Sequence, residues 1–167
     1  MKKYFFSLFL FCFLFLLVGV VFAEQVQVGN GTFYIPEGFN RLHVKESEQQ
    51  NGNVAGVGYF NGNGDLIMLF AVNFRRDIDV NSQEIKQDIT ERFGATDIRT
   101  FAYAGRNILT ATAKDEEGGV SYLSCFARNG VIYFINFSEK NTITGKKIIS
   151  PSGRNLVFSI VNSFQER

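Results

Sequence analysis

Apolar and polar residues alternate with period two over several segments of the chain, which predicts β-strands. Asn-Gly pairs lie between some of these segments, and this pair favours the positive φ angles of tight hairpin turns. The last segment is apolar in both of its alternating sets, so its strand needs cover on both faces of a sheet. The predicted strands are 32–35, a hairpin of 54–60 and 66–74, and a meander of 98–103, 107–114, 120–128 and 131–138.

A first covering helix is predicted after the hairpin. Ile85, Ile89 and Phe93 recur every four residues, with polar residues on the opposite side, so the segment is an amphipathic helix. Asn81 is the predicted N-cap, and Gly94 supplies the C-terminal stop. The helix is therefore expected to pack its apolar stripe on one face of the sheet.

A second helix is predicted at the C-terminal end, where Ser150-Pro151 forms a favourable N-cap and N1 pair. Gly153 in the first turn is expected to weaken this helix. Its apolar stripe consists of Leu156, Val157, Ile160, Val161 and Phe164. The element order predicts an α+β fold, with an antiparallel sheet of about six to seven strands flanked by two main helices.

The N-terminal segment has the pattern of an export signal. Lys2-Lys3 precede an apolar run without charge or proline, and Val21-Phe22-Ala23 suits cleavage before Glu24. The apolar run is longer than an ordinary signal core and close to the length of a membrane span, so a retained anchor is the alternative. The predicted organisation is a leader over 1–23 and a single domain over 24–167, in an extracytoplasmic location, either secreted or tethered at the cell surface. Membrane contact is expected only through an uncleaved leader.

Charge argues against a nucleic-acid partner. The chain has 17 basic and 16 acidic residues, and removal of 1–23 takes away two lysines, leaving a net charge of about −1. A nucleic-acid-binding domain normally has a basic face and a positive excess. Only Arg75-Arg76 and Lys146-Lys147 form basic pairs in the mature chain, which is typical of a solvated rim.

The sequence contains no pattern for a catalytic site, a cofactor or a phosphate-binding loop. Outside the leader Cys125 is the only cysteine, which excludes an intramolecular disulfide. Cys125 and His43 are the only candidate nucleophile and base. Cys125 falls in an apolar set of a predicted strand, whereas a reactive thiolate requires an exposed or electropositive site, so we expect a core residue and a non-enzymatic protein.

No metal site is predicted either. Asn61, Asn63 and Asp65 have the 1-3-5 spacing of a calcium loop, but Leu66 and Val72 occupy the positions that require glycine and glutamate. A hairpin turn is the simpler interpretation. The acidic run 115–117 before a Gly-Gly pair is likewise interpreted as a solvated hairpin tip.

Two sequons would be glycosylation acceptors in an exported chain, at Asn30 in a predicted loop and at Asn136 near a strand end. The mature chain is also rich in phenylalanine and tyrosine and lacks tryptophan. These rings are expected to fill most of the core, and any surplus would form an exposed docking strip. The candidates for that strip are Tyr59, Phe60, Phe74, Phe101 and Tyr103.

The element order, together with 33–39 (FYIPEGF) near the mature N-terminus and 160–164 (IVNSF) at the end, resembles the PsbP-type α/β/α sandwich. The resemblance implies an interaction or accessory role, since family members mostly bind other proteins. No ion-linked residue of the family aligns with a position here. The leading hypothesis is an exported, non-catalytic module that docks a protein partner at the cell envelope. A carrier of a small apolar ligand or lipid and an undetected hydrolase are the alternatives.

Overall fold

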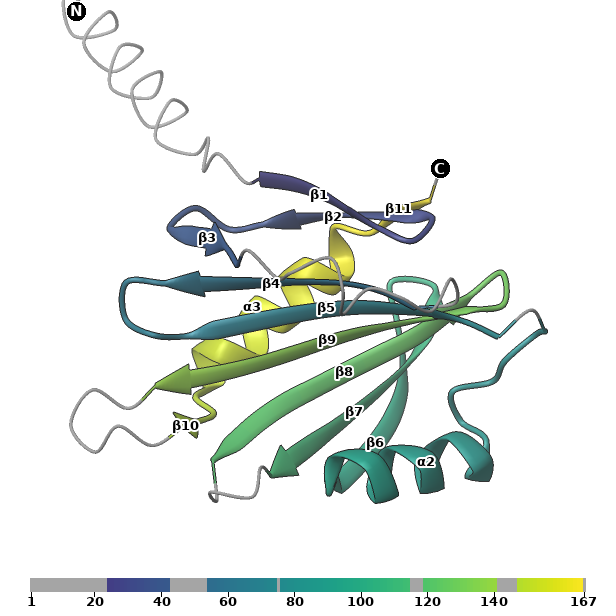
Figure 1. The fold of residues 1–167 in the computed structure, drawn as a ribbon. Helices are drawn as coiled ribbons and strands as arrows, with labels where there is room; N and C mark the ends of the chain where they lie inside the picture. The colour runs from purple at the N-terminus through teal and green to yellow at the C-terminus, as the bar shows by residue number, and fades with distance from the viewer. Residues whose placement is uncertain (1–23, 43–53, 75, 115–118, 141–146, 167) are drawn as a thin grey trace, which may run out of the picture.

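The computed structural model describes residues 24–42, 54–74, 76–114, 119–140 and 147–166 (Figure 1). The predicted leader and its cleavage point lie outside these ranges. Within them, neither helix has the length and apolar character needed to cross a membrane. The strands are β1 (Glu24–Val28), β2 (Gly31–Ile35), β3 (Phe39–Arg41), β4 (Val54–Asn61), β5 (Leu66–Asn73), β6 (Thr96–Tyr103), β7 (Arg106–Lys114), β8 (Val120–Arg128), β9 (Val131–Lys140), β10 (Lys147–Ile148) and β11 (Gln165–Glu166). The helices are α2 (Gln83–Phe93) and α3 (Pro151–Asn162).

The larger sheet has the strand order β3-β4-β5-β9-β8-β7-β6, and every neighbouring pair is antiparallel. β10 pairs with β9 outside this path. The hairpin β4–β5 and the meander β6 to β9 lie where the sequence predicts them. β5 inserts next to β9, so the last strand of the meander is central, which explains why both of its faces are apolar. The predicted antiparallel sheet flanked by two helices is confirmed.

A smaller sheet, which the sequence did not predict as a sheet, joins the two ends of the described chain. β2 is the predicted strand near the N-terminus, and it pairs with β1 on one side and with the C-terminal β11 on the other. β1 and β2 contribute Val26, Val28, Phe33 and Ile35 to the same core as α3. The smaller sheet therefore extends the layer that covers one face of the larger sheet.

α3 is seated closely against β9, behind the larger sheet in the view of Figure 1. The predicted cap is confirmed, because the Ser150 hydroxyl accepts a hydrogen bond from the Gly153 amide at 3.0 Å. Val157, Ile160 and Val161 are fully buried in this core. Gly153 is buried too, and a Cβ atom built there would lie 2.5 Å from the Phe137 ring. Gly153, which we expected to weaken the helix, is thus the residue at which the helix and the sheet approach each other closely.

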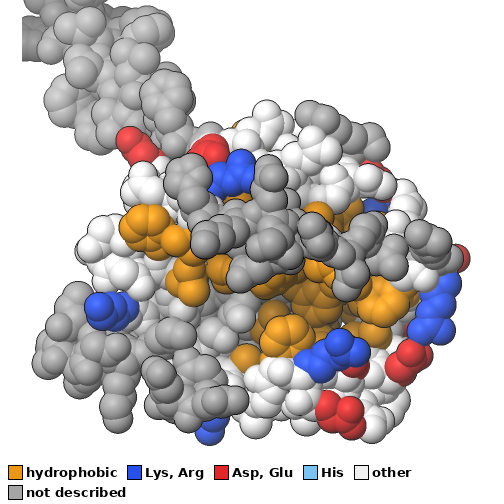
Figure 2. All heavy atoms as spheres, in the orientation of Figure 1, with side chains coloured by type: hydrophobic (Ala, Val, Ile, Leu, Met, Phe, Trp, Pro, Cys, Tyr) orange, Lys and Arg blue, Asp and Glu red, His pale blue; other side chains and the backbone are white. Residues whose placement is uncertain are grey.

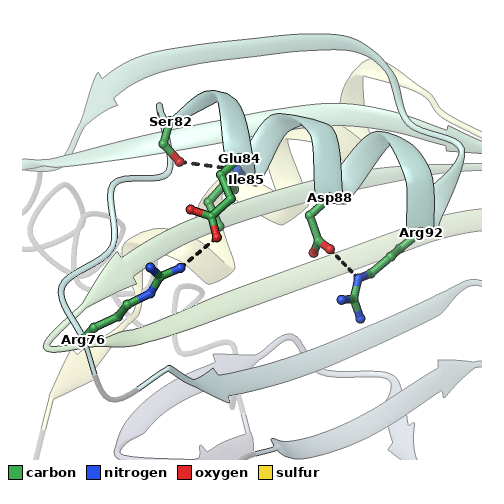
Figure 3. A network of polar contacts seen from close by, with 6 residues as sticks. All are labelled: Arg76, Ser82, Glu84, Ile85, Asp88 and Arg92. Atoms are coloured by element: carbon green, nitrogen blue, oxygen red, sulfur yellow. Dashed lines mark hydrogen bonds and ion pairs between the residues drawn. The ribbon is translucent and has the colours of Figure 1, made fainter.

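α2 covers the opposite face over β7 and β8, and it packs Ile85 and Ile89 into a second core cluster. The predicted stop is confirmed, since Gly94 has a left-handed φ of 56°. The predicted N-cap was one residue off. The Ser82 hydroxyl accepts a hydrogen bond from the backbone amide of Ile85 at 3.3 Å (Figure 3), while the backbone amide of Asn81 donates to the Asp79 carboxylate. Serine and asparagine cap about equally well, so the sequence alone did not separate them.

The outer face of α2 carries ion pairs rather than contacts to the sheet. Glu84 pairs with Arg76 at 2.7 Å and Asp88 with Arg92 at 2.5 Å (Figure 3). Three of these side chains are largely exposed, and that of Asp88 is half-buried. Exposed pairs of this kind add at most about 1 kcal/mol each. They keep that face of the helix polar and leave the apolar stripe to fix the position of α2 on the sheet.

Candidate docking surface

β6 forms one edge of the larger sheet and pairs, within the described part of the chain, only with β7. The register of the β6–β7 pairing shifts between Thr96 and Arg99, where Asp97 has a positive φ of 52°. A bulge of this type protects the beginning of an edge strand against pairing with other chains. From Arg99 to Tyr103 the register is regular, so this stretch presents an ordinary strand edge.

An aromatic group lies where this edge strand meets α3. It consists of Phe101 and Tyr103 on β6, Tyr122 on β8 and Phe158 on α3. The Phe158 ring centroid lies 5.8 Å from that of Phe101, 5.4 Å from Tyr103 and 6.2 Å from Tyr122. Phe101 and Tyr103 nevertheless remain 38% and 36% exposed, whereas Tyr122 is buried. The aromatic group is therefore anchored in the core at one end and open to solvent at the other.

A cation borders the aromatic group. The Arg154 guanidinium on α3 lies 5.5 Å from the centroid of the Tyr122 ring, a cation–π arrangement. No described carboxylate lies within 4 Å of Arg154. The surface beside β6 thus combines a strand edge, two exposed rings and one cation.

Only part of the predicted aromatic strip lies on this surface. Phe101 and Tyr103 are brought together, but Phe60 on β4 and Phe74 after β5 are exposed on other parts of the sheet. The prediction for Tyr59 was wrong: its side chain is fully buried, and its hydroxyl donates to Glu24 at 3.0 Å. Strand alternation places Tyr59 on the face covered by β1, and β1 was not foreseen.

Sequence reasoning also missed Phe158 and Tyr122 as members of the aromatic group. Phe158 lies next to the predicted apolar stripe of α3 but is not part of it. Tyr122 lies on the face of β8 opposite to that of Cys125, the face that packs against α3. The spacing of Arg154 and Phe158, four residues apart on one helix, was the available signal. Recognising it required knowing that α3 crosses the sheet near β6.

A second face of the larger sheet is also apolar. α2 covers β7 and β8 but not β4 and β5, where Met68, Phe70 and Val72 are half-buried. Figure 2 shows hydrophobic side chains gathered on the sheet face above α2 in this view. The β6 surface is the better-defined candidate, because its exposed rings and the neighbouring cation all have described contacts.

The candidate nucleophile is a core residue, as predicted. Cys125 is completely buried in the cluster under α2, and burial raises the pKa of its thiol to about 12. A thiol in that state is neutral at physiological pH and is a poor nucleophile. His43, the proposed base, lies outside the described residues.

The residues with calcium-loop spacing form the turn between β4 and β5. Asn61 accepts from the amides of Asn63 and Asp65, and its side-chain amide donates to the Asp65 carboxylate at 2.8 Å. The same carboxylate accepts from the Lys140 amide. The side-chain oxygens of Asn61 and Asp65 are thereby used within the fold. Across the described ranges no group of three histidine, cysteine or acidic side chains is placed to hold a metal ion, and the acidic run 115–117 lies outside them.

The two sequons occupy different environments. Asn30 is exposed in the turn between β1 and β2. Asn136 is half-buried in the central strand β9, opposite Met68 of β5 and Leu123 of β8, and its side-chain oxygen is buried. Glycosylation at either residue stays a prediction, and the geometry favours Asn30.

The fold defines the class of protein: an α+β sandwich with an antiparallel sheet between helical layers. It is similar to cyanobacterial PsbP (CyanoP) from Synechocystis sp. PCC 6803, whose structure was determined in solution. The TM-score is 0.55 at 11% sequence identity, and the match covers 90% of this chain and 95% of CyanoP. No family model and no curated protein sequence matches the chain. The PsbP-like fold predicted from the element order is confirmed.

Proposed function

We propose that the protein is an exported, non-catalytic binding module that docks an extended segment of a partner protein at the cell envelope. The observation that carries this proposal is the regular edge of β6 beside the exposed rings of Phe101 and Tyr103. An edge strand offers unpaired backbone groups to an incoming strand, and neighbouring pockets select its side chains.

The surface defines the chemistry of the partner segment. An apolar or aromatic side chain would pack against Phe101 and Tyr103, because exposed rings gain most from burial against another apolar group. An acidic side chain would pair with Arg154, for which the described residues provide no carboxylate. The expected segment is therefore extended, with an apolar residue and an acidic residue on the side that faces α3.

Other properties of the chain support a binding role over catalysis or transport of an apolar ligand. The only candidate thiol nucleophile is buried and neutral. A pocket of about 440 Å³ at the end of the sheet is lined in part by Asp79, Arg106, Arg128 and Glu166, whereas a lipid carrier needs an apolar lining. The envelope location rests on the basic and apolar leader.

The experiment is site-specific photo-crosslinking with the full chain in the cells that produce it. A photoreactive phenylalanine analogue replaces Phe101, and parallel chains carry it at Phe60 or Phe74, which have matched exposures of 42% and 37%. We expect a discrete crosslinked protein from position 101 only. A Tyr103→Ser substitution added to the position-101 chain should then reduce the yield of that product.

The variants are first checked for native folding by circular dichroism and thermal melting. Equal crosslinking from positions 60 or 74, or unchanged crosslinking after Tyr103→Ser, would show that the β6 surface is not the docking site. Loss of the crosslink on Cys125→Ala in a folded protein would contradict the non-catalytic binding role, because Cys125 does not reach this surface.

A further inference from the structure

A pocket of about 440 Å³ lies at the end of the larger sheet, beyond the β6–β7 turn. Its walls come from four parts of the chain: the turn at 104–107, the end of β8 at 126–128, the segment 78–80 before α2, and Phe164 with Glu166 near the C-terminus. The volume falls in the range of small-molecule sites, about 300–1,000 Å³.

Arg106 is the central cation of this pocket, and its guanidinium is held rigidly. Its central carbon lies 4.9 Å from the centroid of the Phe126 ring and 5.0 Å from that of Phe164. One terminal nitrogen donates to the Val161 carbonyl at 3.2 Å. Both contacts are cation–π arrangements, so the N–H groups other than the one bonded to Val161 remain available as hydrogen-bond donors.

Most donors of Arg106 are unused within the described structure. A guanidinium has five N–H groups, and the described residues provide a single acceptor, the Val161 carbonyl. No described carboxylate lies within 4 Å of Arg106. A second cation, Arg128, lines the same pocket but is paired with Glu166 at 2.9 Å. The pocket therefore contains one paired and one unpaired arginine.

The electrostatic setting favours an anion beside Arg106. Burial lowers the pKa of Arg106, and the charge of Arg128 lowers it further. Both effects disfavour the charged guanidinium, and no described carboxylate within 4 Å supplies compensation. A planar oxyanion that accepts two parallel hydrogen bonds from the guanidinium edge would supply it.

We propose that this pocket binds a carboxylate group, with Arg106 as its anchor. A carboxylate matches the planar fork of arginine and carries a single charge. Asp79 and Glu166 also line the pocket, so a doubly charged phosphate would meet repulsion that a carboxylate meets only in part. The carboxylate belongs either to a small acid or to the C-terminus of a peptide, and both present the same group to Arg106.

The test is an NMR titration of the isotope-labelled full chain with sodium acetate, sodium succinate and a short peptide with a free C-terminus. Sodium chloride at equal ionic strength and inorganic phosphate at pH 8 are the controls. We expect the side-chain Nε–H signal of Arg106 and the amide signals of Gly105 and Asn107 to shift with carboxylates and not with chloride. Preference for the peptide over its C-terminally amidated form identifies a peptide terminus, and preference for the free acids identifies a small molecule.

Two variants and one control make the test specific. Arg106→Gln should weaken carboxylate binding by about tenfold or more, the effect of losing a charge-assisted hydrogen-bond pair. Glu166→Gln removes a negative charge from the lining and should tighten binding several-fold, a gain that loss of folding cannot imitate. Arg92→Gln, on the outer face of α2, should change nothing.

The proposal is overturned if carboxylates shift these signals no more than chloride does, or if phosphate binds more tightly than carboxylates. It is also overturned if the Glu166→Gln variant binds no better than the original chain. These outcomes do not depend on whether a protein partner docks at β6, so the two proposals can fail separately.

Discussion

A Gly153→Ala substitution should change the free energy of unfolding through two opposing effects, a gain in helix propensity and a loss of packing. Alanine is favoured over glycine in a helix by at most about 1 kcal/mol. The new Cβ, however, would lie 2.5 Å from the Phe137 ring and 2.9 Å from the carboxyl carbon of Glu139. Phe137 is buried in the central strand β9 and has no solvent to move into.

The cost of this clash follows from two contacts. Overpacking a well-filled core costs about 1–3 kcal/mol. Displacing Glu139 also disturbs the beginning of α3, because its carboxylate accepts from the Ser150 amide at 2.6 Å and from the Ser150 hydroxyl at 2.7 Å. Losing a cap costs about 1 kcal/mol. After subtraction of the propensity gain, we expect the free energy of unfolding to fall by about 1–3 kcal/mol.

The assay is urea denaturation followed by circular dichroism, with Asn155→Ala as the matched control. Asn155 lies on the same helix with an exposed side chain, so alanine there should raise stability by up to about 0.7 kcal/mol. Adding Phe137→Leu to Gly153→Ala removes the nearest ring atom, and the double variant should be more stable than the sum of the single effects predicts. If Gly153→Ala stabilises the protein as Asn155→Ala does, the close seating of α3 on β9 is refuted.

Three further predictions concern the cap of α2, the buried ionisable groups and the leader. Ser82→Ala should lower the free energy of unfolding by about 1 kcal/mol, and Asn81→Ala by clearly less, in urea denaturation; equal effects would contradict the cap assignment. Burial raises the pKa of Tyr59 from 10.0 to about 12 and that of Cys125 from 9.0 to about 12. Between these values the folded state keeps protons that the unfolded state loses. The free energy of unfolding should therefore fall as the pH rises from about 9 to 12. Urea midpoints against pH measure this loss, and Cys125→Ala should remove the part that begins near pH 9, whereas a flat profile would refute the burial argument. Mass spectrometry of the native protein should find Glu24 as the first residue, and a persistent Met1 would instead indicate a retained anchor.

The strands of the larger sheet could be predicted because each is marked by a pattern within its own segment of the sequence. Each strand of the β4–β5 hairpin and of the meander alternates within its own sequence, and turn residues separate the strands. The apolar character of both faces of 131–137 even indicated that this strand needs cover on both sides. The order of the strands was not predictable, since β5 inserts beside β9, and the paired residues are distant in the sequence, from Asn73 with Val131 to Leu66 with Ser138.

The smaller sheet and the docking surface depend on contacts that no local pattern encodes. β11 is two residues long and pairs with β2 across almost the whole chain. On the other side of β2, β1 covers Tyr59 and removes it from the predicted aromatic strip. In the same way, Phe158 joins Phe101 and Tyr103 only because α3 crosses the sheet near the edge strand. The sequence supplied the aromatic residues, and the topology decides which of them are exposed together.

The two proposed sites are adjacent, so a variant at one site can be tested for its effect on binding at the other. Tyr103 and Arg106 are opposite each other in the β6–β7 ladder, on either side of a two-residue turn, and directly opposed residues lie about 5 Å apart. A segment that adds to β6 in the parallel direction would therefore direct its C-terminal end toward the Arg106 pocket. If such a segment carried a free carboxylate there, Arg106→Gln would lower crosslinking from position 101 as well as carboxylate binding. If the two sites serve different ligands, that variant would leave the crosslink unchanged, and Tyr103→Ser would leave carboxylate binding unchanged.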